Sequence, residues 1–401
     1  MLRIVHTADW HWEADKIEKC QASADFIVSK LRELKPDLHI IAGDYWNRRQ
    51  TLTKLSAVIP ALETMRQLAE ISPVVLIYGN EAHDAAGSYE IFRNLDTQYP
   101  IYVEDRAGAI GLIRNVGGAC FFAPANDPSM ASEFEVILHL FPYPTKQWFL
   151  ADKENLSIDE SNQLIQDALR KIFTGFGAIS MEAKCPVIFV GHCNVSGAML
   201  SSGQTLLGQD IMVRKQDLLL AQADYYALGH IHKAQGFGKN MWYSGSIYHC
   251  NFGEVEAKIF NLVTFDDNTV VKSEQVTVEA IQIPSRPLVL HEIELGEKGA
   301  ISFLTDANID CRDVEMRIRV HGTKEQQTSF TDEEIESRFL GQPYSIVIER
   351  ITTPTERVRS NDVTKAKTLA DKLSEWAKVT DQQISQDVLA LASDVERSVT
   401  L

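Results

Sequence analysis

The chain has 401 residues, of which 45% are hydrophobic and 23% are charged, the composition of a soluble globular protein with two or three domains. No apolar run has the length that a bilayer span needs, and no basic stretch precedes the first strand, so we expect neither a membrane segment nor a secretory signal. Its six cysteines lack CxxC spacing, which argues against a zinc knuckle or a disulfide framework and indicates a reducing cytoplasm.

The formal net charge of −16 bears on what the protein can bind. A protein that grips nucleic acid mainly through its own phosphate contacts is usually basic. Either the substrate is not a long polyanion, or bound metal ions and a partner supply the positive charge. A solvated acidic surface explains the same charge equally well.

The first half of the chain alternates apolar strands with amphipathic helices. We predict strands at residues 2–5, 37–44, 73–80, 119–123, 135–141, 185–192 and 225–230. We predict helices at 17–34, 52–69 and 158–173, the last of them capped by Ser157. Near-continuous apolar strands between helices indicate an α/β protein with a sheet buried on both faces.

After residue 252 the pattern changes to strands. Residues 257–278 read as a hairpin that turns at 266–268, and the alternating segments 286–295, 313–322 and 344–351 with helix-like 331–340 indicate a small α+β unit. The tail is polar and then helical. Two apolar stripes mark these helices, one of Leu369, Leu373 and Trp376 and the other of Ile384, Val388, Leu391 and Val395.

Polar motifs follow the predicted strands. They are "HTADWHW" with Asp9 and His11, "IAGDYWN" with Asp44, "IYGNEAHD" with Asn80, His83 and Asp84, "FVGHCNVSG" with His192, and "ALGHIHK" with His230 and His232. In open α/β sheets, ligands bind at the carboxyl ends of the strands. Mixed nitrogen and oxygen ligands suit two borderline-to-hard divalent cations, manganese or iron more naturally than a metal that demands thiolate. We assign the remaining histidines to packing: His6, His39, His139, His249, His291 and His321.

The order of these motifs resembles that of the calcineurin-like metallophosphoesterases. "GHCNVSGAMLSS", "DYYALGHIHKAQ" and "YSGSIYHCNFGE" are similar to the SbcD branch, an exonuclease subunit related to the eukaryotic meiotic-recombination nuclease. The resemblance spans residues 2–254. It implies a two-sheet sandwich flanked by helices at 1–280, a small α+β capping and DNA-binding domain at 281–352, and a helical tail at 353–401 that contacts an ATPase.

The resemblance also implies a ligand set for two divalent ions, most naturally Mn²⁺, with Fe²⁺ or Mg²⁺ as alternatives. Asp9, His11 and His232 would bind the first ion together with Asp44. Asp44 would bridge to the second ion, which Asn80, His192 and His230 would complete. Two ions that share a carboxylate sit roughly 3.5–4 Å apart and activate a water for attack on phosphorus.

The loop after Asn80 departs from the family pattern, in which a histidine follows the asparagine directly. Here Glu81 and Ala82 intervene. In the first interpretation they bulge outward, so that His83 and Asp84 form the catalytic pair and Asp84 orients the imidazole. In the second, Glu81 takes the place of the histidine, and a carboxylate beside a phosphodiester would depress activity.

A second departure lies after Asp44, where Asn47 replaces a histidine that is common in relatives. Asn47 can hydrogen-bond a phosphate oxygen, and Arg48 and Arg49 can bind phosphates bidentately. A solvated start to the next helix explains the two arginines equally well. Further candidate DNA contacts are Lys233, Arg317, Arg319, Arg357 and Arg359.

Together these features predict a two-metal DNA exo/endonuclease subunit that acts in DNA end processing, repair and recombination. The resemblance implies an SbcC-like ATPase partner that receives the terminal helices, and a homodimer is a further possibility. Those helices could instead fold back on the chain's own core. Two alternative functions stay open: a small-molecule phosphoesterase on the same fold, and a metal-binding DNA scaffold subunit weakened at Glu81.

Overall fold

The computed structural model describes the chain except residues 128, 152–155, 202–209, 237, 239, 255, 267–275, 297–299, 305–310, 313, 340, 342, 354–364, 381–382 and 400–401. The chain forms two compact units. Unit 1 comprises Met1–Leu290, Asp313–Glu315 and Pro343–Ser345, and unit 2 comprises His291–Arg312, Met316–Gln342 and Ile346–Leu401. The division into three domains at residues 280 and 352 stays a prediction.

The first sheet of unit 1 has the order β15-β14-β1-β2-β3-β4. Its strands are β1 (Leu2–Thr7), β2 (Leu38–Ile41), β3 (Val74–Ile77), β4 (Ile101–Glu104), β14 (Ile259–Phe265) and β15 (Val276–Gln282). β1 to β4 run parallel, and β14 is antiparallel to both β1 and β15. The two arms of the expected hairpin are therefore confirmed, while residues 267–268 of its turn lie outside the described part.

The second sheet has the order β12-β13-β11-β8-β7-β5-β6. Its strands are β5 (Gly108–Arg114), β6 (Cys120–Pro124), β7 (Phe134–Phe141), β8 (Val187–His192), β11 (Tyr225–Gly229), β12 (Gln235–Gly236) and β13 (Met241–Tyr243). β7, β8, β11 and β13 are parallel, with antiparallel strands at the edges. A separate short pair joins β9 (Asn194–Val195) to β10 (Met212–Val213).

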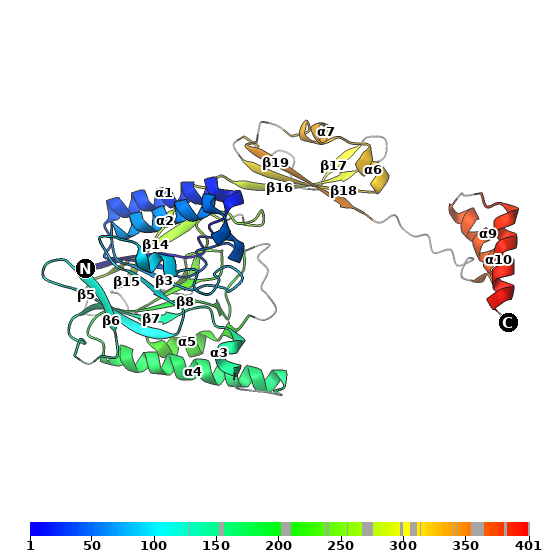
Figure 1. The fold of residues 1–401 in the computed structure, drawn as a ribbon. Helices are drawn as coiled ribbons and strands as arrows, with labels where there is room; N and C mark the ends of the chain where they lie inside the picture. The colour runs from blue at the N-terminus through cyan, green and yellow to red at the C-terminus, as the bar shows by residue number, and fades with distance from the viewer. Residues whose placement is uncertain are drawn as a thin grey trace. The chain divides into compact units, whose positions relative to one another are not determined.

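Helices cover both outer faces of unit 1 (Figure 1), with α1 and α2 on one side and α4 on the other. The α-helices are α1 (Ile17–Leu34), α2 (Leu55–Ala69), α3 (Lys146–Leu150), α4 (Ile158–Glu182) and α5 (Lys215–Leu218). Short 3-10 helices are η1 (Ala14–Lys16), η2 (Arg49–Thr53), η3 (Glu90–Asn94) and η4 (Leu219–Ala221).

The predicted Ser157 cap of α4 is confirmed. The Ser157 hydroxyl accepts from the Glu160 amide at 3.2 Å, and the Glu160 carboxylate accepts from the Ser157 amide at 2.9 Å, a reciprocal capping box. The helix runs nine residues beyond the predicted end at Phe173, to Glu182.

Three apolar layers hold the sandwich together. The first packs Leu31 of α1 against Val74 of β3, and the second fills the space between the sheets with residues such as Ile40 and Leu138. The third lies under α4 around Phe173. β2, β3, β8 and β11 are buried along their whole length, as the continuous apolar segments predicted.

Unit 2 has a four-stranded sheet of order β17-β16-β18-β19. Its elements are β16 (Leu288–Leu295), which begins in unit 1, β17 (Ile301–Phe303), β18 (Glu315–Gly322), β19 (Ser345–Thr352), α6 (Lys324–Thr328) and α7 (Asp332–Glu336). Thr323 and Thr331 cap the two helices through capping boxes. These elements match the α+β pattern predicted after residue 286.

The tail forms two helices, α9 (Leu369–Thr380) and α10 (Gln386–Val399). The Leu369 amide donates to the Glu396 carboxylate at 3.1 Å, and Ala377 and Ala392 are buried. Apolar side chains of the predicted stripes stay partly exposed, among them Trp376 at 42% and Leu391 at 63%. In the described ranges, no helix combines the length and apolar character that crossing a bilayer requires.

We expect the buried Phe173 side chain of α4 to contribute strongly to the stability of the third apolar layer. Its ring is fully buried, with centroids 5.2 Å from Phe141 and 5.8 Å from Phe189. Phe173→Ala should lower the free energy of unfolding by about 3–5 kcal/mol, because it removes buried area and leaves a cavity. Urea denaturation measures the change. Met181→Ala, at an exposed position of the same helix, should stay within about 0.5 kcal/mol, and equal stability of the two variants would contradict the layer assignment.

Candidate metal centre

The predicted ligands meet at one edge of the two sheets. Asp9 and His11 follow β1, Asp44 follows β2, and the loop with Asn80 follows β3. From the second sheet, His192 ends β8 and lies opposite Gly229 of β11, so that His230 and His232 come next to it. The side chains that the sequence placed after five separate strands therefore converge.

The backbone at this edge is held in a conformation that L-residues rarely adopt. Asp9, His11, Asp44 and His230 have φ values of 52°, 48°, 51° and 96°. Hydrogen bonds between adjacent strand ends fix it: the Asp9 amide donates to the Gly43 carbonyl at 3.0 Å, and the His11 amide donates to the Asp44 carbonyl at 3.0 Å. Such strain clusters at functional sites, where it re-aims side chains.

Gly43 and Gly79 let the loops approach each other closely. A Cβ on Gly43, where φ is 87°, would lie 2.3 Å from His192 Nδ1, and one on Gly79 would lie 2.1 Å from Asp44 Oδ1. Any side chain at either position would push a predicted ligand out of place.

The Asp44 carboxylate lies at the centre of the site. Its Oδ2 is 3.3 Å from His192 Nε2 and 3.9 Å from both His11 Nε2 and His83 Nε2, while Oδ1 accepts the Asn80 amide at 2.7 Å. Burial by itself would raise the pKa of Asp44, but the positive charge of His192 and His83 outweighs it and lowers that pKa well below its usual range. The carboxylate therefore stays ionised in a buried place.

His192 is locked in orientation by its other nitrogen. Nδ1 donates to the Ala42 carbonyl at 2.7 Å, which turns Nε2 toward Asp44. Burial would lower the pKa of His192, but the Asp44 carboxylate overrides it and raises that pKa to about 9. The site thus favours a positive charge on Nε2, which a metal cation can supply in place of the proton.

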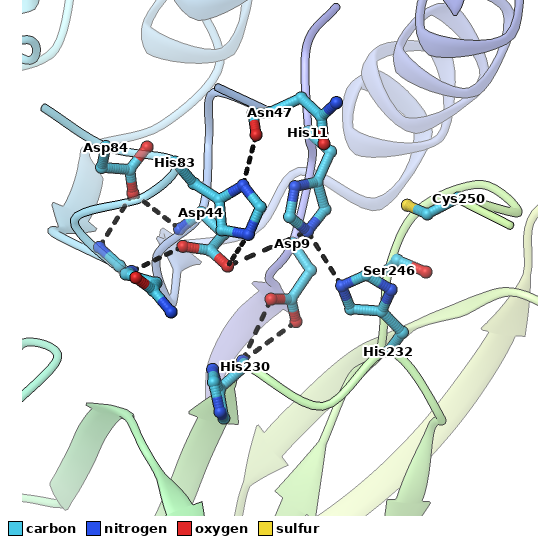
Figure 2. Close-up of polar contacts among 12 residues, drawn as sticks. Asp9, His11, Asp44, Asn47, His83, Asp84, His230, His232, Ser246 and Cys250 are labelled. Carbon is cyan, nitrogen blue, oxygen red and sulfur yellow. Dashed lines mark hydrogen bonds and ion pairs between the residues drawn. The ribbon is translucent and has the colours of Figure 1, made fainter. Parts of the chain in front are cut away.

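His11 and His232 form the second half of the site. Their Nε2 atoms lie 3.0 Å apart, and the pKa of His11 is lowered by burial and then by His232 and His83. His232 Nδ1 hydrogen-bonds to Glu254 Oε1 at 2.8 Å, which fixes the imidazole so that Nε2 faces His11. The Asp9 carboxylate accepts the His230 amide at 3.0 and 3.2 Å beside them (Figure 2).

These side chains have the composition and spacing of metal ligands. Three groups of donor atoms each lie within 4.8 Å of one another: His11, His232 and Cys250; His11, Asp44 and His83; Asp44, His192 and His230. Imidazole nitrogens with carboxylate oxygens suit divalent transition metals. The Asn80 side-chain oxygen already accepts the Ala82 amide at 2.9 Å, and its second lone pair would have to serve a metal.

The structure brings in three residues that the sequence did not assign. Glu254 is fully buried and orients His232. Burial would raise the pKa of the Glu254 carboxyl, but hydrogen bonding from His232 outweighs burial and lowers that pKa to about 2. Asp210 Oδ2 lies 3.4 Å from His230 Nε2. Glu254 and Cys250 stand in the quoted stretch "YSGSIYHCNFGE", which was a signal for their place, whereas Asp210 stands in no motif.

The insertion after Asn80 puts His83, rather than Glu81, beside the Asp44 carboxylate. Glu81 is exposed and its carboxylate lies 3.5 Å from Arg49. The His83 imidazole keeps 31% of its surface, with its ring centroid 4.8 Å from that of His11. This geometry corresponds to the bulge interpretation of the loop.

The expectation that Asp84 orients the His83 imidazole is wrong. Both Asp84 oxygens accept backbone amides instead: Oδ2 from Asp44 at 2.9 Å and Gly79 at 2.8 Å, and Oδ1 from Trp46 at 3.1 Å. Asp84 therefore holds two strand-end loops together, and burial, followed by the charge of Asp44, raises its pKa to about 7.

The partner of the imidazole is a main-chain group. His83 Nδ1 hydrogen-bonds to the carbonyl oxygen of Asn47. Asn47 thus contacts the loop after Asn80 through its backbone, a role that its side-chain identity could not signal. The predicted contact of its side chain with substrate stays a prediction.

Most of the predicted cationic contacts are engaged by acidic side chains. Arg48 Nε lies 3.0 Å from Glu13, and Arg49 pairs with Glu81. In unit 2, Arg319 lies 3.2 Å from both Glu292 and Glu349, and Arg317 lies 3.7 Å from Glu349. Lys233 is half-buried, and Arg357 and Arg359 lie outside the described residues.

The histidines assigned to packing belong to none of the three donor groups. His6 hydrogen-bonds to the Tyr225 hydroxyl at 2.9 Å and His139 to the Ser180 hydroxyl at 2.8 Å, both fully buried. His39, His249, His291 and His321 are likewise in none of the three donor groups. Burial lowers the pKa of His6 and His39 to about 3, so both rings stay neutral.

Comparison with known proteins gives matches of three kinds. A family model described as calcineurin-like phosphoesterase matches residues 2–234. The SbcD subunit of the SbcCD nuclease from Escherichia coli K12 is 25% identical over 297 residues, which cover 70% of this chain and 69% of that protein, and the protein from strain O157:H7 gives the same values. A dimetal phosphatase structure from Danio rerio covers 71% of this chain and 99% of its own at 9% identity, with a TM-score of 0.39, too weak a likeness to carry an argument.

Removing the Asp84 carboxylate should destabilise the edge of the two sheets where the predicted metal ligands meet. Asp84→Ala leaves three buried amides without their acceptor, and each such loss costs about 1–3 kcal/mol, so we expect the free energy of unfolding to fall by about 3 kcal/mol or more. Urea denaturation tests this. Glu81→Ala, three positions away and exposed, is the control and should change stability by less than about 0.5 kcal/mol. An Asp84→Ala protein as stable as this control would refute the loop-holding role.

Proposed function

The chain belongs to the calcineurin-like phosphoesterase family, whose members use a dinuclear metal site, and from this premise we propose that it is a two-metal DNA exo/endonuclease subunit. Family membership supports a metal-dependent phosphoesterase. The narrower proposal, hydrolysis of DNA phosphodiester bonds in end processing, repair and recombination, draws on the similarity to the SbcD subunit of the SbcCD nuclease.

One observation carries the proposal: a buried, ionised carboxylate with imidazoles on several sides. Asp44 Oδ2 faces the Nε2 atoms of His192, His11 and His83 within 3.9 Å. A single carboxylate in this position can bridge two divalent ions that lie about 3.5–4 Å apart. A protein that used these residues only for packing would bury no such charge, because an isolated buried carboxylate is costly.

The proposed ligand roles follow the two halves of the site. Asp9, His11, His232 and Asp44 would hold the first ion. Asp44, Asn80, His192 and His230 would hold the second. When bound, two divalent ions supply Lewis-acid polarisation of the phosphoryl oxygens and lower the pKa of a water. Mn²⁺ is our proposed metal, with Fe²⁺ and Mg²⁺ as alternatives.

His83 would act on the leaving group. Its Nδ1 is held by the Asn47 carbonyl, so the Nε2 side of the ring faces the site beside Asp44. Protonated there, Nε2 donates its proton to the departing sugar oxygen, as a general acid. Asp84 does not act on the leaving group in this scheme, since its oxygens accept backbone amides.

The acidic chain requires positive charge from elsewhere to hold DNA. Arg48 and Arg49 are paired with Glu13 and Glu81, so substrate phosphates would have to displace those carboxylates. We propose that an SbcC-like ATPase supplies the remaining DNA contacts and receives the partly apolar α9 and α10. We propose a cytoplasmic location, and a homodimer stays a prediction.

The decisive assay is manganese-dependent cleavage of a duplex DNA end by the full chain, with bis-p-nitrophenyl phosphate as a small ester for comparison. We expect cleavage of DNA. Asp44→Ala should abolish it and release bound metal, measured by elemental analysis, because the shared carboxylate is gone. Cleavage of the small ester without cleavage of DNA would overturn the nuclease proposal in favour of a small-molecule phosphoesterase.

His83→Ala separates the acid from the metal site. We expect kcat on DNA to fall by about 10²–10⁴-fold while the metal content stays unchanged, since general-acid help is lost and no ligand is removed. Glu81→Gln is the matched control in the same loop and should keep kcat within about threefold of wild type. If His83→Ala retained full activity and Glu81→Gln lost it, the bulge interpretation would be wrong.

A further inference from the structure

Cys250 stands at the edge of the proposed metal centre and has no assigned role. Its sulfur, one His11 nitrogen and one His232 nitrogen lie within 4.8 Å of one another. In Figure 2 it lies beside the His11 and His232 rings, across them from Asp44. A thiol placed with two imidazoles is a recognised combination of metal donors.

Two histidine nitrogens accompany the Cys250 sulfur in this cluster, so the proposed ligand set does not depend on a cysteine alone. His232 Nδ1 is bonded to the Glu254 carboxylate at 2.8 Å, which fixes the ring so that Nε2 is directed toward His11. That Nε2 lies 3.0 Å from His11 Nε2. His11 is 1% exposed, so its nitrogen is aimed at this point from inside the protein. Both histidines belong to the same donor group as Cys250.

The backbone of Cys250 is fixed on both sides. Its amide donates to Glu254 Oε2 at 3.0 Å, and its carbonyl accepts from Lys16 Nζ at 2.8 Å. The carboxylate that orients His232 thus also positions Cys250. The backbone of Cys250 is thus fixed beside the imidazole, and its thiol donates to the Tyr248 carbonyl at 3.7 Å.

The distances suit a single ion. Zinc-type ions hold imidazole nitrogen at about 2.0–2.1 Å and thiolate sulfur at about 2.3 Å, so two such donors on a tetrahedral ion stand about 3.3–3.7 Å apart. Donor atoms within 4.8 Å of one another reach that separation by side-chain movements of about 1–1.5 Å.

We propose that Cys250 binds, as a thiolate, the ion that His11 and His232 hold, and that this sulfur shifts the first metal position toward Zn²⁺, Fe²⁺ or Co²⁺, while the preference for Mn²⁺ proposed above applies to the second position. Soft thiolate ligands favour these ions, whereas carboxylate and amide oxygens favour the harder ones. On binding, the thiol proton leaves to solvent and no electron is transferred. The inference rests on the proposed two-metal function and makes its two positions chemically unequal.

Cobalt is the direct probe, because a Co²⁺–thiolate bond absorbs in the near ultraviolet while nitrogen and oxygen ligands give only weaker visible bands. The metal-stripped full chain is titrated with Co²⁺ as wild type, Cys250→Ser and Cys185→Ser, the last a similarly half-buried cysteine outside the cluster. We expect the charge-transfer band in wild type and Cys185→Ser and its complete loss in Cys250→Ser. Zinc affinity of Cys250→Ser should also fall by at least about tenfold, the loss that even an outer partner of a metal ligand can cause.

The outcomes of the cobalt titration distinguish failure of the Cys250 inference from failure of the proposed two-metal function. Visible cobalt bands without a charge-transfer band, the same in wild type and Cys250→Ser, would overturn the thiolate ligand and leave the two-metal proposal intact. Failure of wild type to bind Co²⁺ at all would overturn both. Alkylation of the unmutated chain removes any dependence on folding of the variant: saturating Zn²⁺ should slow iodoacetamide labelling of Cys250 by at least about tenfold and leave Cys185 unchanged. Equal protection or none at Cys250 would count against the inference.

Discussion

The site depends on one buried carboxylate, that of Asp44, remaining ionised. Asp44 is 2% exposed, and burial by itself would favour its neutral form. The imidazoles around it reverse that preference, and the amide of Asn80 adds a hydrogen bond. The arrangement is stable only if positive charge stays close, either as protons on the histidines or as metal ions. Electrostatics and metal binding are therefore two aspects of the same constraint.

A second carboxylate, that of Asp84, supports this arrangement by accepting hydrogen bonds from backbone amides. Asp84 accepts amides of Asp44, Trp46 and Gly79, and so ties the loop after β2 to the loop after β3. Asp84 follows the Glu81–Ala82 insertion in the chain. Its hydrogen bonds therefore anchor the loop after the insertion, and the two additional residues are accommodated between Asn80 and His83. The insertion changes the path of the loop and keeps the imidazole beside Asp44.

Three histidines of the centre differ in the group that fixes their orientation. His192 is fixed by the Ala42 carbonyl, His232 by the Glu254 carboxylate, and His83 by the Asn47 carbonyl. In each case the bonded nitrogen is Nδ1, which leaves Nε2 toward the site. Such outer partners set the tautomer and the direction of a ligand, and two of the three are main-chain atoms. Their identity is thus insensitive to side-chain substitution.

The sequence by itself determined the buried strands that end at the site, the order of the motifs and the residue types at the strand ends, because buried parallel strands leave a continuous apolar signal and their polar ends stand out against it. It also indicated that His83 could stand in for a displaced histidine. Only the tertiary structure decided that Asp84 binds backbone and not His83, that Arg48 and Arg49 are paired with carboxylates, and that Glu254, Asp210 and Cys250 reach the centre. A motif marked the neighbourhood of Glu254 and Cys250 but not their contacts, because those contacts depend on which loops meet in space and on main-chain acceptors.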